Sequence, residues 1–375
     1  MIRRLLLIFT AISGLLCLSS CDVHEFPDVE TQNDVRLHLT LDYSLALPLY
    51  QTVNFGGSRY DNPSDFYDVR YTLNFYPYSD SRDDTYSRTP AFTRVLTRND
   101  VSKPDASFDI DIPRGNYHVI VWTDYVEIGT TGHLYYNPDD FAYIQLHGEE
   151  HHGNTDFRDA FQGHADIDAQ TGIPEQSGLG FKPDPIEISA TIHNSRPLGK
   201  YNIISTDLEK FISRAIESRE SRAKELALQK EAAISAGQPP GTISPEEIKP
   251  TIDLSDFTVV VRYPMYMPSA FNAFTNKPTD SKTGKSFKGK ITANADGNAE
   301  LGFDYVFVNG AESGAQIAID VYDYDGTQLA GTGTITVPLL RSKLTTVTGE
   351  FLTVTTQGGV GINPGFNGDF NLEIK

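Results

Sequence analysis

Cysteine is nearly absent from this chain, because only Cys17 and Cys21 occur among its 375 residues. Both lie near the N-terminus, so the rest of the chain has neither disulfides nor a cysteine–histidine nucleophile pair. A chain of this length buries enough surface to fold without disulfides. The Gly-x-Ser-x-Gly elbow of serine hydrolases is also missing. These absences argue against the commonest nucleophilic enzymes.

Positive charge is also scarce, with 31 Lys plus Arg against 50 Asp plus Glu and a formal net charge of −19. A strongly acidic protein is repelled by phosphate backbones and by anionic lipid surfaces. Nucleic acid is therefore excluded as a partner. The segment 310–314 (GAESG) lacks the Gly-Lys-Ser/Thr ending of a phosphate loop, and no cofactor is implied.

The first 20 residues have the pattern of a secretion signal. Arg3 and Arg4 precede an apolar run over 5–18, which is too short for a permanent transmembrane helix. The run ends in Leu-Ser-Ser followed by Cys21, a sequence that resembles the bacterial lipoprotein signal. We expect cleavage before Cys21 and lipidation of its thiol, with an ordinary secretion signal as the alternative. The mature chain would retain 29 Lys plus Arg and a charge of about −21.

Residues 21–34 are acidic overall and lack periodicity, which predicts a flexible tether. Strict alternation of apolar and polar residues begins at 35–42, the pattern of a half-buried β-strand. Similar runs separated by turn formers predict an N-terminal antiparallel sandwich over 35–204. The other expected strands are 69–75, 108–112, 117–123, 141–146 and 186–193.

One long helix interrupts the β pattern. Thr206 and Glu209 form a capping-box sequence, and apolar residues follow at helical spacing until about 216. The later part carries mostly charge and alanine, so we expect only the first half to pack on a sandwich. A coiled-coil dimer is the alternative, although fewer than three heptads are present. We assign 205–252 to a helical insertion and a Pro-rich linker.

A second β-sandwich is expected over 253–375. Its predicted strands include 315–324 and 327–337, which flank Asp325-Gly326, a strong hairpin signal. The other expected strands are 257–263, 286–293, 300–308, 343–355 and 370–374.

Histidines cluster at His147, His151 and His152, with His164 nearby, and such residues can bind zinc. Gly148 stands where the helical zinc-hydrolase motif needs glutamate, and Gly153-Asn154 follows at once. We therefore predict a solvated polar loop without a metal, and no catalytic residue. A metal-assisted hydrolase is the remote alternative.

Two further sites are interpreted as structural. A calcium loop at Asp320, Asp323 and Asp325 would need acids at alternate positions, which Val321 interrupts, so we expect a hairpin turn. Asp304, Asp320 and Asp323 are expected on the solvent face of strands. Trp122 offers a sugar-stacking surface, but its strand is apolar on both parities, which predicts a buried position.

Several segments resemble fimbrillin-like lipoproteins of the Bacteroidetes, in an uncharacterised branch of that group. The closing segment 339–353 (LLRSKLTTVTGEFLT) carries the resemblance most clearly. The others are 114–117 (RGNY), 122–125 (WTDY), 154–161 (NTDFRDAF), 196–201 (RPLGKY) and 267–272 (MPSAFN). The resemblance covers nearly the whole mature chain except the stretch from about 213 to 250. None of the motifs that carry it is catalytic.

The resemblance implies a mainly β protein with two tandem antiparallel β-sandwich domains, of transthyretin-like or Greek-key type, and one long helical insertion. It also implies an outer-membrane lipoprotein that serves as a pilus stalk, tip or anchor subunit or as an adhesin. Stalk-type members lose their first strand to an Arg-specific protease and accept a strand from a neighbour, which is β-strand addition.

Candidate residues for such assembly are present. Val35, Leu37, Leu39 and Leu41 share one face of the first strand, and Phe370, Leu372 and Ile374 share one face of the last. Either strand could be the donor. Arg59, between Gly-Gly-Ser and tyrosine, is the candidate processing site, with an ordinary loop arginine as the alternative.

Two main functions remain open. The first is a fimbrial subunit, anchor or tip whose partners are the membrane, other fimbrial subunits or itself. The second is a monomeric surface lipoprotein that binds a glycan or host ligand. Asp22 would favour inner-membrane retention under the enterobacterial sorting rule, but sorting in the resembled group differs, and we expect the outer membrane.

Overall fold

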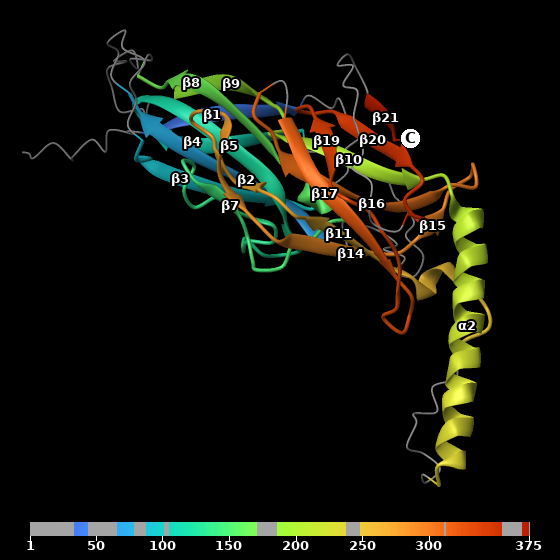
Figure 1. Cartoon of the computed structure of the whole chain (residues 1–375). Helices are drawn as coiled ribbons and strands as arrows, with labels where there is room; N and C mark the ends of the chain where they lie inside the picture. The colour runs from blue at the N-terminus through green and yellow to red at the C-terminus, as the bar shows by residue number, and fades with distance from the viewer. Residues whose placement is uncertain are drawn as a thin grey trace, which may run out of the picture.

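A computed structural model describes residues 34–43, 66–78, 88–100, 105–170, 186–237, 248–310, 313–354 and 370–374. These residues form a mainly β protein, which confirms the predicted fold class (Figure 1). One α-helix, α2 (Leu208–Ser235), and two 3-10 turns, η2 (Asp156–Arg158) and η3 (Leu254–Asp256), are the helical elements of the described residues. None of the helices in these ranges is long and apolar enough to cross a membrane.

The N-terminal sandwich consists of two sheets that enclose one apolar core. Their strand orders are β4-β1-β9 and β3-β2-β5-β8. Alternating side chains from both sheets meet in the core because successive residues of a strand point to opposite faces. The strands are β1 (Asp34–Tyr43), β2 (Tyr67–Pro77), β3 (Phe92–Arg98), β4 (Ala106–Pro113), β5 (Asn116–Glu127), β8 (Phe161–Asp168) and β9 (Ile186–Asn194).

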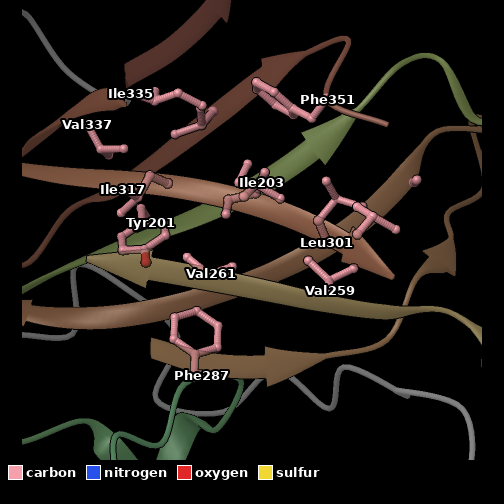
Figure 2. Packing of buried hydrophobic residues seen from close by; sticks show 14 of the residues in the cluster. Tyr201, Ile203, Val259, Val261, Phe287, Leu301, Ile317, Ile335, Val337 and Phe351 are labelled. Carbon is pink, nitrogen blue, oxygen red and sulfur yellow. The ribbon is translucent and has the colours of Figure 1, made fainter. Parts of the chain in front are cut away.

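The C-terminal sandwich pairs the sheet β15-β16-β10-β20-β21 with the sheet β14-β11-β17-β18, and β19 also pairs with β17. Figure 2 shows Tyr201 and Ile203 of β10 packed among side chains of β11, β16 and β17. The strands are β10 (Leu198–Ser205), β11 (Thr258–Tyr263), β14 (Lys285–Gly289), β15 (Thr292–Ala293), β16 (Ala299–Phe307), β17 (Ser313–Tyr322), β18 (Gln328–Gly331), β19 (Ile335–Leu339), β20 (Leu344–Gly349) and β21 (Phe370–Ile374).

The hydrogen bonds of β10 correct one expected boundary. Residues 198–204 were expected in the N-terminal sandwich, but β10 pairs with β16 and β20 of the C-terminal one. The helical segment therefore lies between two strands of the second sandwich. Alternation identifies a strand but does not identify its partners, so the sequence pattern could not place this one.

Three strand pairs depart from the expected antiparallel arrangement. β1 runs parallel to β9, and β20 runs parallel to both β10 and β21. The two-residue period of side chains is the same in parallel and antiparallel pairs, so it cannot reveal strand direction.

A smaller sheet of order β13-β12-β7-β6 lies between the two sandwiches. Its buried residues join outward side chains of β5 and β16 in a third apolar cluster. Trp122 is at its centre and fully buried, which confirms the predicted core position. The strands are β6 (Tyr136–Asn137), β7 (Ile144–Leu146), β12 (Met267–Asn272) and β13 (Lys277–Lys282).

Helix α2 packs on the C-terminal sandwich by its first turns and then projects away from it (Figure 1). Leu208, Phe211 and Ala215 are buried, whereas Leu228 and Ile234 are 66% and 71% exposed. The predicted capping box is wrong. Asp207 is the N-cap residue. Its carboxylate accepts hydrogen bonds from the backbone N–H groups of residues 352 and 353, shortly after β20. These bonds hold the start of the helix against the end of that strand.

Candidate assembly strand and the sandwich junction

Strand β1 lies between two partners rather than at a sheet edge. It pairs antiparallel with β4 along eight residue pairs and parallel with β9 along nine. Val35, Leu37, Leu39 and Leu41 are each 0% exposed and lie in the core of the N-terminal sandwich, as their alternation predicts. Removal of β1 would therefore open a groove bounded by two unpaired strand edges and floored by apolar side chains.

The outward face of β1 carries a set of ion pairs that the sequence pattern did not indicate. Arg36 Nε lies 3.2 Å from Asp111 Oδ1 on β4. His38 lies between both neighbours, with Nδ1 2.6 Å from Asp109 Oδ1 of β4 and Nε2 3.6 Å from Glu187 Oε2 of β9. The hydrogen bond with Asp109 is the main reason that the pKa of His38 is raised.

At the other end of β1 the charges are reversed, with the acid on β1 and the histidine on its neighbour. Asp42 Oδ2 lies 3.1 Å from Nδ1 of His193 on β9. Between the two ends, Thr40 lies in register with Ser107 and Thr191. From Arg36 to Asp42 the outward positions of β1 thus run basic, basic, neutral, acidic, and each faces a complementary or neutral group.

The second predicted donor, the C-terminal strand, is also part of a sheet. β21 pairs parallel with β20 as the last strand of its order, with Phe370, Leu372 and Ile374 in register with Thr345, Val347 and Gly349. The two candidate strands lie in different sheets of different sandwiches, and the structure does not bring them together. Figure 1 shows β1 and β21 in opposite halves of the molecule. Cys21 and Arg59 lie outside the described residues.

The predicted solvated histidine loop is wrong for His151. Its Nε2 donates to Asp304 Oδ2 at 2.6 Å, and both side chains are buried. The guanidinium of Arg158 pairs with the other oxygen of Asp304, and the hydroxyl of Tyr263 donates to the same carboxylate at 2.5 Å. The loop is folded inward because Arg158 compensates the buried charge of Asp304 and His151 hydrogen-bonds to the same carboxylate.

Two further ion pairs lie beside this one. Asp159 accepts from Arg196 Nε at 2.8 and 2.9 Å with both side chains fully buried. Asp156 accepts from Lys200 Nζ at 2.6 Å and from the hydroxyl of Tyr305 at 2.8 Å. We call the whole group the junction cluster, and it consists of His151, Asp156, Arg158, Asp159, Arg196, Lys200 and Asp304.

Burial and charge act in opposite directions on the junction cluster. Burial works to raise the pKa of Asp304, but Arg158 and His151 outweigh it and the pKa is lowered. Burial lowers the pKa of His151, and Arg158 lowers it further, so this ring is neutral. Burial raises the pKa of Asp159 to about 6, against the opposing pull of Arg196.

The expected exposure of two acids in and after β17 is also wrong. Asp320 and Asp323 were expected on solvent faces, yet both are buried. Asp323 accepts from Arg219 Nη2 at 2.6 Å and also pairs with Arg222, whereas Asp320 pairs with Arg262. The Asp325-Gly326 hairpin is present between β17 and β18, with Gly326 at a φ of 84°.

These acids pair with arginines rather than with each other. Across the described ranges no group of three or more His, Cys, Asp or Glu side chains could hold a metal ion.

His151 and Asp304 are too deeply buried for a substrate to reach them. Their arrangement is suited to fixing the two sandwiches against each other.

One sequence signal could have identified Asp304. It is the single charge in the otherwise apolar run 301–308 (LGFDYVFV), and a carboxylate there requires a buried partner. Asp124, in the run 119–126 (VIVWTDYV), follows the same rule and pairs with buried Arg70 at 2.6 Å. The partners themselves lie far away in sequence.

The fold and the junction cluster define a mainly β protein of two sandwiches joined by buried ion pairs. Residues 28–375 match a family described as a family of unknown function (DUF6562). The chain belongs to this family. No curated protein matches the sequence.

Solved structures similar to this chain come from Bacteroidetes, the group that the sequence resembles. A candidate cell adhesion protein from Bacteroides eggerthii is 10% identical over 91% of this chain and 95% of its own, with a TM-score of 0.37. A candidate polysaccharide-binding protein from Bacteroides thetaiotaomicron is 9% identical over 79% of each chain, with a TM-score of 0.37.

The fimbrial anchor protein Mfa2 from Porphyromonas gingivalis is 8% identical, with a TM-score of 0.31. The match covers 79% of this chain and 81% of Mfa2. Because these TM-scores lie below 0.5, we derive no function from them.

Proposed function

We propose that the mature protein is a lipid-anchored structural or adhesive protein of the cell surface. In this proposal it is a fimbrial subunit, or an anchor or tip component, and Cys21 holds it on the outer membrane. The signal pattern before Cys21 supports the anchor, since two or three acyl chains contribute enough buried CH₂ groups for stable attachment.

Assembly by β-strand addition is proposed for β1. The observation that carries this proposal is that a strand with four fully buried side chains belongs to the N-terminal end of the sandwich. The 23 residues 44–66 separate β1 from β2, so a cut there would leave β1 held only by noncovalent contacts. A strand from a neighbour could then form the same backbone hydrogen bonds and fill the same apolar positions.

We propose the following organisation, and the strand pairing supports its division between the two sandwiches. Residues 1–20 are the signal, 21–34 the tether, and the first sandwich begins with β1. We place the division between the sandwiches at 195–197, just before β10, with the helical segment of 205–252 inside the second sandwich. We propose no enzymatic activity, since buried charged groups serve as ion pairs between the sandwiches, Arg158 with Asp304 and Asp156 with Lys200.

The second candidate is a monomeric surface lipoprotein that binds a glycan or host ligand. It is favoured by the complete integration of β1, whose ion pairs on both sides stabilise the uncut chain. Exposed Met265 and Tyr266, in the turn between β11 and β12, offer one apolar contact surface.

The size of the protein purified from native membranes, together with its N-terminal residue, tests the proposal. Heat-labile ladders of polymers that contain this chain support assembly by strand addition. A monomer that begins at Cys21 and binds a glycan array tightly supports the second candidate instead.

A further inference from the structure

The groove occupied by β1 has a charge pattern of its own. The acids Asp109 and Asp111 of β4 and Glu187 of β9 surround one end, and His193 of β9 lies at the other. All four side chains are on the outer face of the sheet, next to the outward positions of β1. Apolar side chains fix which face of a strand points inward, and these charges add information about its direction and register.

A strand that fits this groove must therefore carry charges in a defined order. Cations are needed at the positions of Arg36 and His38, because each faces an acid on one or both neighbours. An anion is needed at the position of Asp42, which faces His193. Opposite charges across neighbouring strands are stabilising, and like charges are destabilising.

The C-terminal strand has the wrong charges for the groove. Its polar alternate positions are Asn371, Glu373 and Lys375. With Phe370 in the place of Val35, Glu373 would occupy the position of His38, beside Asp109 and Glu187. A shift by two residues leaves the acids without a cation and places Lys375 beside His193. A shift by four residues pairs Glu373 with His193 but puts Asp369 in the position of His38, beside Asp109 and Glu187.

We infer that the groove recognises its strand by charge and, in assembly, takes the first strand of a second copy of this chain while excluding the C-terminal strand. The inference rests on the proposed strand addition and chooses between its two donors. The first strand of another copy carries Arg36, His38, Thr40 and Asp42 in the required order, so it restores every pair.

Strand exchange into the full-length protein tests this inference. A specific protease site replaces residues 56–60, the protein is cleaved there, and labelled peptides compete with the resident β1. The peptides are residues 30–46, the same peptide with Arg36→Glu and His38→Glu, and residues 364–375. The sandwich itself is unaltered, so its folding is common to all three measurements.

The native peptide is expected to exchange in, with the charge-reversed and C-terminal peptides at least about tenfold weaker. Asp109→Lys with Asp111→Lys in the protein should reverse the preference between the native and charge-reversed peptides. In 1 M salt the preference should shrink, because the Debye length falls to about 3 Å.

The possible failures are distinguishable. Equal binding of the native and charge-reversed peptides, or tight binding of the C-terminal peptide, would overturn recognition by charge and leave strand addition intact. Absence of exchange by every peptide would overturn strand addition and the inference together.

Discussion

His151 and Asp304 form a buried hydrogen bond across 153 residues of sequence, with Nε2 2.6 Å from Oδ2. His151 belongs to the loop before η2, and Asp304 belongs to β16 of the C-terminal sandwich. Arg158 pairs with the same carboxylate. The contact therefore connects the two halves of the chain through polar and charged side chains that are almost fully buried.

Removal of the His151 side chain should destabilise the protein. His151→Ala leaves a cavity and takes away one hydrogen-bond donor from a buried carboxylate, so we expect a loss of about 2 kcal/mol in the free energy of unfolding. The matched control is His152→Ala, whose side chain is exposed and which should stay within about 0.5 kcal/mol. Urea titration measures both, and equal stability of the two variants would contradict the burial of His151.

The same histidine gives a pH dependence of defined sign. Its folded pKa lies below the ordinary value of about 6.5, mainly because of burial. As the pH falls below about 6.5, His151 binds a proton in the unfolded chain but not in the folded chain. The free energy of unfolding therefore falls until the pH is below the folded pKa. Subtraction of the same curve for His151→Gln removes the contribution of other groups. A difference curve that is flat between pH 7 and 5 would disprove the neutral buried ring.

The helix should tolerate changes in its distal half and not in its first turns. Phe211 is buried with its ring centroid 4.8 Å from that of Phe257, so Phe211→Ala should cost about 3–5 kcal/mol. Leu228→Ala, on the projecting part, should change stability by less than about 0.5 kcal/mol. Thermal unfolding compares the two. A large loss from Leu228→Ala would mean that the distal half packs against another surface.

Local alternation was sufficient to predict much of the fold. The inward face of β1, the burial of Trp122 and the hairpin at Asp325-Gly326 each depend on residues next to one another in sequence. Several strands were missed, among them β8 and β10. Glycine at positions 163 and 199 weakens their strand signal, yet a Cβ there would lie 2.6 Å from the backbone oxygen of His193 in β9 and 2.8 Å from that of Leu340, just after β19.

The junction cluster could not be predicted because its pairs join distant segments. Asp304 alternates with Phe303 and Tyr305 and so has the pattern of an outward residue, but it lies on the side of Val306, in the core of the C-terminal sandwich, where the hydroxyl of Tyr263 reaches it. Two segments that carry the family resemblance, 154–161 and 196–201, supply five of its charges. Their residue types now have a physical reason, which is the pairing of Asp156 with Lys200 and of Asp159 with Arg196.

Lipid attachment is tested at a single residue. Cys21→Ala should leave the signal uncut or release the protein from the membrane fraction, because no other cysteine of the mature chain can carry an acyl group. Labelling with radioactive palmitate gives the measurement, and Cys17→Ala is the matched control that should remain labelled. A wild-type protein that takes up no label would exclude the anchor.

The central claim is that another strand can take the place of β1, and cleavage between β1 and β2 tests it most directly. Limited trypsin treatment of the purified protein, with Arg59→Gln as the control, is followed by intact mass and by size-exclusion chromatography. The account predicts a cut after Arg59, loss of the first strand under mild warming, and conversion of cut monomers into higher-order species when uncut Arg59→Gln protein, which keeps its first strand, is added as the donor. A cut protein that stays monomeric in that mixture, with the melting curve of the uncut protein, would contradict strand addition and leave the monomeric adhesin as the better account.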